Sequence, residues 1–78
     1  MKDIYTVIIY DDGGVSTVSF LDVNDAIRYA TAEIVEYSAE DEAEVMNELE
    51  EQLFWSDGNS FNVYIEEAKL CDSFNGKL

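Results

Sequence analysis

Carboxylic acids are the residues that could do chemistry in this sequence. Its 78 residues include 18 Asp and Glu, one Cys and no His. Neighbouring carboxylates can act as a general acid and a general base, but with so many acids such pairs arise by chance. Cys71 has no His to activate it as a nucleophile, and a single Cys completes neither a zinc site nor an internal disulfide. We therefore expect no catalytic residue, no metal and no cofactor, and a protein that is not an enzyme.

The balance of charge indicates a different kind of function. With only 4 Lys and Arg, the chain has a net charge of -14, and a magnitude of roughly 2–8 already keeps a small domain soluble. Such an excess destabilises the compact state through self-repulsion. It also repels nucleic acid and anionic membranes, and it attracts basic surfaces. We therefore expect a basic protein partner and no direct contact with nucleic acid or membrane.

The acids concentrate in one segment. From Glu33 to Glu51 there are nine acids and no Lys or Arg, whereas solvated helices usually interleave both signs. Four glutamates there are spaced by 4, 4 and 3 residues, which on a helix places them on one face with successive carboxylates roughly 5–6 Å apart. The phosphates of one DNA strand follow one another at about 3.4 Å, so the line is sparser but comparable. The predicted partner-binding residues are Glu40, Asp41, Glu44, Glu48 and Glu51, with Asp11 and Asp12 as a second contact.

Two features of this predicted surface can also be interpreted in another way. A line of exposed glutamates is also typical of a helix face that simply contacts solvent. Trp55 follows the acidic segment, and as an exposed side chain it would be an anchor for a partner, because Trp is enriched at binding hot spots. The alternative, which the turn sequence beginning at Ser56 favours, is that Trp55 packs against the sheet.

The elements that must position these residues follow from the hydrophobic pattern. β-branched and aromatic residues at 4–10, a turn sequence at 11–14 and alternation at 15–20 predict a β-hairpin. Apolar residues at helical spacing then predict a helix that has Asp22 as its N-cap and ends near Tyr37. Ser38 and Asp41 resemble a capping box, which would start a second helix over about residues 39–54.

The remaining residues complete a small α+β fold. Residues 56–60 form a turn-rich loop and residues 61–66 alternate as a third strand, while residues 68–74 are compatible with a short edge strand or an irregular segment. We expect an antiparallel or mixed sheet packed against two helices in the order ββααβ, in a single compact domain of residues 1–78. No apolar run approaches the ~18 residues of a membrane span, and the N-terminus has no cleavage pattern. We therefore expect a soluble, cytoplasmic protein.

In size, charge and element pattern the chain resembles a group of small acidic inhibitors encoded by phages. These are the anti-CRISPR and anti-restriction proteins, several of which act as DNA mimics. They share no common motif, so the resemblance transfers no functional residue. It implies an inhibitor of host defence that binds a Cas effector or a restriction nuclease in the host cytoplasm. Such effectors hold nucleic acid in positively charged channels, so an acidic protein would compete for the same Lys and Arg side chains as a monomer or small homo-oligomer.

Two other classes of function remain open at this point. An acidic immunity protein or antitoxin that neutralises a basic nuclease toxin would use the same electrostatic contact. A structural or regulatory subunit would instead form oligomers through the apolar edge of the sheet or through the C-terminal segment.

Overall fold

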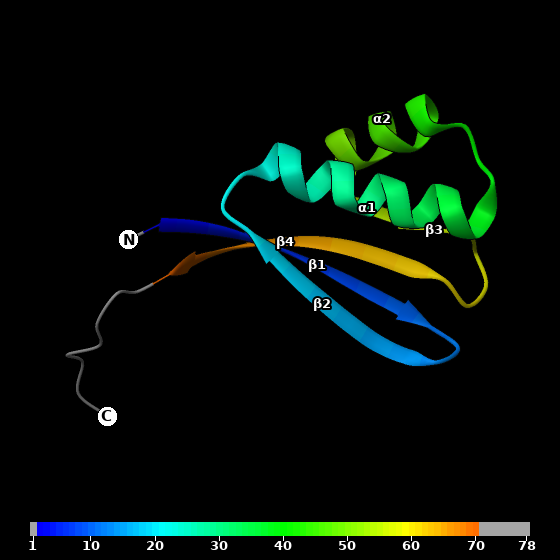
Figure 1. The fold of residues 1–78 in the computed structure, drawn as a ribbon, viewed down its shortest axis with the longest axis horizontal. Helices are drawn as coiled ribbons and strands as arrows, with labels where there is room; N and C mark the ends of the chain where they lie inside the picture. Colours follow the sequence, from blue (N-terminus) through cyan, green and yellow to red (C-terminus); the bar gives the residue numbers. More distant parts are fainter. Residues whose placement is uncertain (1, 71–78) are drawn as a thin grey trace.

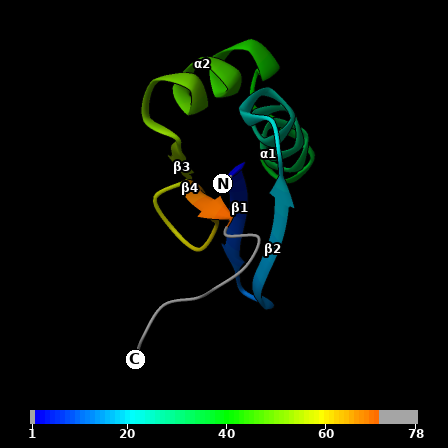
Figure 2. The same ribbon diagram turned by 90° about the vertical axis from the view of Figure 1, so that its left-hand side faces the viewer.

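Strands and helices alternate in pairs along the part of the chain that the computed structural model describes, residues 2–70. The elements are listed in chain order and drawn in Figure 1: β1 (Lys2–Asp11), β2 (Gly14–Phe20), α1 (Val23–Ser38), α2 (Glu42–Gln52), β3 (Phe54–Ser56) and β4 (Asn62–Leu70). The strands form one sheet in the order β2-β1-β4-β3, with every neighbouring pair antiparallel. Both helices lie on the same face of this sheet (Figures 1 and 2). The expected α+β class is confirmed, with one strand more than the predicted order.

The predicted hairpin forms at residues 11–14. The pairing of β1 with β2 runs without interruption from Tyr5 opposite Phe20 to Asp11 opposite Gly14. The Asp11 carboxylate accepts a 2.8 Å hydrogen bond from the N–H of Gly13, and Gly14 has a φ of 128° that side chains rarely allow. The turn chemistry of the sequence therefore sets the register of β2.

Side chains along the two central strands point alternately to a face of the sheet that the helices cover and to a face that they leave open. Val7 and Ile9 of β1 pair with Ile65 and Val63 of β4, and all four are buried beneath the helices. The opposite face has no helix over it in the described residues, and Tyr64 on that face packs against other aromatic rings of the sheet. Antiparallel sheets commonly have one face against the core and one toward solvent, and this sheet follows that pattern.

Helix α1 begins at the predicted N-cap. The Asp22 carboxylate accepts a 2.7 Å hydrogen bond from the N–H of Asn24. Its buried stripe consists of Ala26, Ile27, Ala30 and Ile34, together with Thr31, which is 2 % exposed and whose hydroxyl donates to the carbonyl of Ile27 at 2.7 Å. Tyr37, near the end of the helix, is apolar at helical spacing but is half-exposed, and it stacks on Phe61 from the loop before β4.

Helix α2 begins three residues later than predicted. Ala39 adopts a left-handed conformation with φ 59° and donates its N–H to the carbonyl of Val35, so it ends α1. Asp41 is the N-cap of α2, and its carboxylate accepts from the N–H of Glu44 at 3.1 Å. The predicted capping box is wrong, because Ser38 donates instead to the carbonyl of Ile34 within α1.

The predicted helical end at residue 54 is also wrong. Leu53 is left-handed with φ 55°, and its carbonyl accepts a 3.0 Å hydrogen bond from the N–H of Ile65. The chain is thereby turned onto the sheet, where residues 54–56 pair with β4 as the additional strand. β4 itself continues to Leu70, so residues 68–70 of the possible edge strand are the end of β4, where they pair with β1 alone. Residues 71–74 of that prediction, like Cys71, lie outside the described residues.

Candidate partner-binding surface

The acids of α2 and of the turn before it are exposed, as a binding surface requires. Asp41 caps the helix, and Glu42 and Glu44 occupy its first turn, where the helix dipole favours negative charge. Glu50 and Glu51 lie in or next to the last turn, where that dipole disfavours it, and α2 has no basic residue there. The predicted acids Glu40, Asp41, Glu44, Glu48 and Glu51 are all solvent-exposed.

A hollow of about 260 Å³ gathers three of the four predicted glutamates. Glu40, Glu44 and Glu48 line it together with Asp57, and Trp55 and Val45 contribute its apolar part. Glu40 lies in the bend before α2 and not on the helix itself, so the predicted line of four is broken at that end. Glu51 does not line the hollow. The tertiary structure therefore replaces a straight ridge with a concave acidic surface.

Trp55 is part of the core and is not an exposed anchor. It is 6 % exposed and pairs with Val63 across the sheet, with its ring 6.2 Å from that of Phe61. Of the two interpretations of this residue, packing against the sheet is the one that the structure confirms. The expectation that Trp55 contacts a partner as an exposed side chain is therefore corrected.

Asp57 is an acid that the helical spacing could not reveal. Its carboxylate accepts hydrogen bonds from the N–H groups of Asn59 at 2.7 Å and Phe61 at 3.2 Å, and from the hydroxyl of Tyr37 at 3.2 Å. The donation from Asn59 is the largest cause of a pKa lowered below the usual aspartate value, with Phe61 and Tyr37 adding to it and desolvation opposing it. Asp57 therefore stays ionised beside the glutamates of α2. The Asp-Gly-Asn turn sequence at residues 57–59 was the only local signal of this loop.

A second hollow of about 280 Å³ holds the acids of the hairpin and of α1. Asp11 lines it with Glu33 and Glu36, and Tyr37 and Phe61 form its apolar wall. The structure thus joins the predicted second contact at the hairpin to α1 and not to α2. Asp12 is exposed beside Asp11 in the same turn.

The two hollows lie side by side at one end of the molecule, which we call the acid end. Tyr37 lines the second hollow and donates its hydroxyl to Asp57, which lines the first, so the Tyr37–Phe61 stack separates them. α1 ends here, α2 begins here, and the hairpin turn and the loop before β4 lie beneath them (Figure 1). The acid end is defined by the seven acids that line the hollows: Asp11, Glu33, Glu36, Glu40, Glu44, Glu48 and Asp57.

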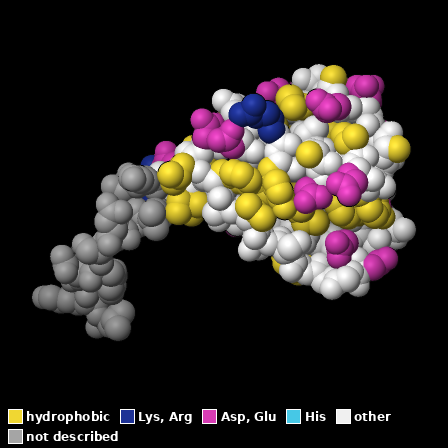
Figure 3. Space-filling view, in the orientation of Figure 1, with side chains coloured by type: hydrophobic (Ala, Val, Ile, Leu, Met, Phe, Trp, Pro, Cys, Tyr) yellow, Lys and Arg dark blue, Asp and Glu magenta, His cyan; other side chains and the backbone are white. Residues whose placement is uncertain are grey.

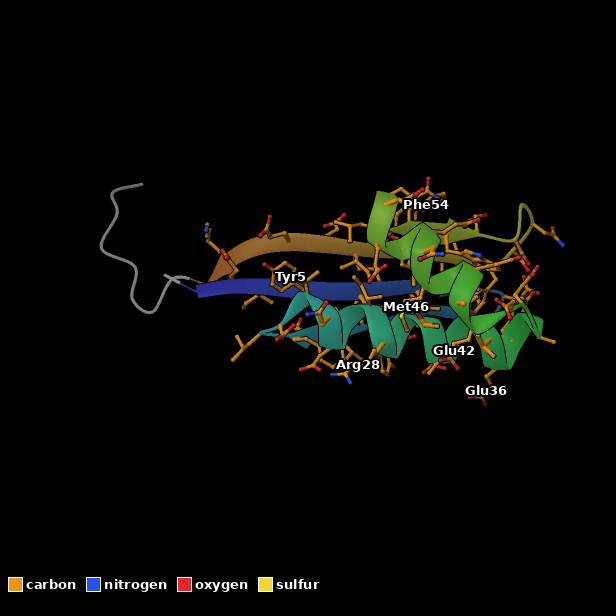
Figure 4. All side chains as sticks on the ribbon, turned by 90° about the horizontal axis from the view of Figure 1, so that it is seen from above. Tyr5, Arg28, Glu36, Glu42, Met46 and Phe54 are labelled. Carbon is orange, nitrogen blue, oxygen red and sulfur yellow. The ribbon has the colours of Figure 1, made fainter. Side chains whose placement is uncertain are left out.

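The positive charges whose side chains the structure describes lie away from the acid end and are already paired. Arg28 donates to Asp25 at 2.6 Å within α1, and Lys69 forms an ion pair with Asp3 that raises the lysine pKa. Figure 4 shows Glu36 and Glu42 at the same end of the helical layer, with Arg28 nearer the opposite end. Figure 3, in the orientation of Figure 1, shows the largest dark blue patch near the upper middle of the visible face, and the right-hand part of this face carries magenta side chains without blue. The described cations therefore do not neutralise the acid end.

Other kinds of site receive no support from the described residues. Within residues 2–70, no group of three or more metal-ligating side chains has an arrangement that would hold an ion. None of the helices in that range has the length and apolar character needed to cross a membrane. Comparison of the chain with models of protein families, with curated proteins and with solved structures finds no match.

Proposed function

We propose that this protein is a non-enzymatic inhibitor that binds the nucleic-acid-binding surface of a basic protein through its acid end. The observation that supports this function is the concentration of seven acids around two adjoining hollows, with the described cations Arg28 and Lys69 paired elsewhere. Clefts of one sign focus the electric field and attract partners of the opposite sign. A Lys- or Arg-lined channel is the surface complementary to this one.

The energies expected for ion pairs indicate that these acids act jointly. An isolated exposed ion pair contributes only about 0–1 kcal/mol, so one glutamate contributes little to binding by itself. Inside a partner's channel water is excluded, and close charge pairs then contribute about 1.5–7 kcal/mol of coupling in favourable cases. Glu44 and Glu48 are one turn apart on α2, a rise of about 6 Å, and so meet two neighbouring cations of a phosphate-binding row together.

The target class we propose is a nuclease that holds nucleic acid in such a channel, either a Cas effector or a restriction nuclease. CRISPR effectors bind their heteroduplex through its backbone in a positively charged channel, and the clustered carboxylates of the acid end would imitate that backbone. Occupation of that channel excludes nucleic acid by competition. The resemblance to phage-encoded anti-defence proteins supports this choice of target, and a basic nuclease toxin is the alternative with the same chemistry.

A competition assay tests this function. The unchanged chain is titrated into a Cas9-type effector with guide RNA, a restriction endonuclease and a basic nuclease toxin, each with labelled substrate. We expect inhibition of at least one of the first two, which weakens as salt is raised. Inhibition confined to the toxin would support an immunity protein instead. Full activity of all three would contradict the proposed function.

Paired charge reversals locate the contact. The double variant Glu44→Lys with Glu48→Lys should weaken inhibition at least tenfold, roughly 1.4 kcal/mol or more. The matched control is Glu66→Lys with Glu67→Lys, which changes the net charge equally at two exposed positions of β4 outside both hollows. Equal losses from both variants would show that net charge and not the acid end determines binding.

A further inference from the structure

β2 is a long edge strand without charge. It lies at one edge of the sheet, and six of its seven residues, Gly14 to Ser19, are exposed. The segment GVSTVSF contains no Asp, Glu, Lys, Arg or Pro, in a chain that is 28 % charged. Its pairing with β1 has no bulge. Natural monomeric proteins protect such edges with charges, prolines, bulges or a covering segment, and β2 lacks the first three.

The opposite edge of the sheet is short where it is paired and charged where it is not: β3 covers only residues 62–64 of β4, and the open part of β4 carries Glu66, Glu67 and Lys69. β3 has only three residues, and the left-handed Leu53 precedes it. α2 packs over that edge, since it contacts β3, whereas α1 spans β1, β2 and β4. The contrast between an edge protected by a short strand, a helix and charges and a long uncharged edge indicates that β2 has a strand partner.

The register identifies the backbone groups that this partner would meet. The two-residue turn closes the hairpin at the pair Asp11–Gly14, and hydrogen-bonded pairs then alternate along an antiparallel ladder. Gly14, Ser16, Val18 and Phe20 consequently bond to β1. The N–H and C=O groups of the intervening residues Val15, Thr17 and Ser19 point away from the sheet.

We infer that β2 pairs in antiparallel fashion with β2 of a second copy of this chain, with Thr17 of both copies on the two-fold axis. In this register Thr17 faces Thr17 and Val15 faces the partner's Ser19. All outward-pointing backbone groups of these three residues are then satisfied, with six hydrogen bonds between the copies. The two sheets become one continuous sheet of eight strands, which removes the uncharged edge from both.

Side chains on both faces support self-pairing. Val18, 36 % exposed on the helix side, lies opposite the partner's Ser16 in this register. Val15, 60 % exposed on the open face, lies beside the partner's Ser19. Thr17 faces its own copy on the axis, and a Thr–Thr pair is one of the cross-strand contacts that stabilise antiparallel sheets.

The distribution of charge selects a second copy over a basic partner. A basic protein is attracted to the acid end, and β2 offers it no charge. Pairing through β2 leaves the two α2 helices over the far edges of the combined sheet, which separates the most acidic elements. Repulsion between two chains of -14 remains, so salt should strengthen the dimer, whereas it should weaken binding to a basic partner. The inference therefore does not rest on the proposed function and is tested separately from it.

Sedimentation of the full chain with two variants at one position provides the test. The unchanged chain should sediment at twice its 8.8 kDa mass, with a dimer fraction that rises with salt. Thr17→Pro removes the outward N–H, a position at which an edge strand tolerates proline, and should weaken the dimer at least tenfold. Thr17→Ala removes the side chain but keeps the N–H and should remain dimeric. A monomeric unchanged chain, or an unweakened Thr17→Pro dimer with a native circular dichroism spectrum, would overturn the inference.

Disulfide formation tests the register even if the proline variant does not fold. In a Cys71→Ser background, Thr17→Cys places two Cα atoms about 5.5 Å apart across the axis, within the range that a disulfide spans. Val15→Cys is the control on the same face. In the proposed register Val15 of one copy is displaced by four residues from Val15 of the other, so the Cα atoms of the two cysteines would be roughly 14 Å apart. We expect an oxidised covalent dimer of the first variant only. Equal cross-linking of both variants, or of neither, would overturn the proposed pairing.

Discussion

The hydroxyl of Tyr37 donates a 3.2 Å hydrogen bond to the carboxylate of Asp57, and this contact connects the last turn of α1 to the loop before β4. The Tyr37 ring stacks on Phe61 at 4.1 Å with planes only 9° apart. Phe61 is 5 % exposed and in turn contacts Trp55 in the core. The acid end is therefore held in shape by an aromatic stack and a fixed carboxylate, although its acids repel one another.

Replacement of Asp57 should destabilise the fold in a pH-dependent way. Asp57→Asn removes the charge that accepts from Asn59, Phe61 and Tyr37, so Tm should fall at neutral pH. Because these donors lower the pKa of Asp57, its stabilising effect is present above the unfolded aspartate value of about 3.9 and is lost as the pH falls through the folded value. In a series of thermal melts the Tm values of the two proteins should therefore approach one another as the pH falls below about 4 and coincide only below the lowered folded pKa.

Asp12→Asn is the control for this experiment. It removes one exposed charge from the hairpin turn, so it should leave Tm unchanged or slightly higher. A fall in Tm as large as that of Asp57→Asn would show that loss of any carboxylate destabilises this protein.

The left-handed Ala39 is a position at which glycine should stabilise the fold. A left-handed conformation costs a residue with a side chain about 1–2 kcal/mol, and glycine adopts it without that strain. After the greater entropy of glycine in the unfolded chain, Ala39→Gly should gain about 0.5–1 kcal/mol in the free energy of unfolding. Chemical denaturation measures the change.

At a second alanine, Ala32, replacement by glycine should instead lower the stability of the fold. Ala32 is exposed in the middle of α1, where glycine costs about 1 kcal/mol relative to alanine. Ala32→Gly should therefore lower stability while Ala39→Gly raises it. Destabilisation by both substitutions would contradict the role of Ala39 as a left-handed cap.

Added salt should stabilise the unchanged chain at neutral pH. The net charge is -14 and α2 has acids in both its first and its last turn, so screening relieves more repulsion than attraction. A melting series from low to high sodium chloride should show a rising Tm. A Tm that falls over the same series would contradict the repulsion argument.

Trp55→Ala should be the most destabilising of these substitutions. Loss of a buried Trp side chain costs about 3–5 kcal/mol, a large share of the roughly 4–12 kcal/mol expected for a domain of this size. Leu21→Ala is the control, because Leu21 is 66 % exposed and should change stability by less than about 0.5 kcal/mol. Comparable losses from both would contradict the burial of Trp55.

Several features of this protein were predictable from the sequence because their causes are local. The Asp22 cap needs only a carboxylate two residues before an N–H, and the hairpin needs only glycine after two aspartates. The α+β class and the exposure of the α2 acids follow from periodicity, which reports one face of one element at a time.

Tertiary structure decided the features whose causes are distant in the chain. A helix could continue through residues 53–55, but the bond from the N–H of Ile65 to Leu53 and the pairing of Trp55 with Val63 favour a strand instead. The acid end likewise combines the hairpin turn, two helices and the loop at Asp57. No helical spacing relates Asp11 to Glu36 or Glu44 to Asp57. Only the burial of a common core against one face of the sheet brings those charges to the same end of the molecule.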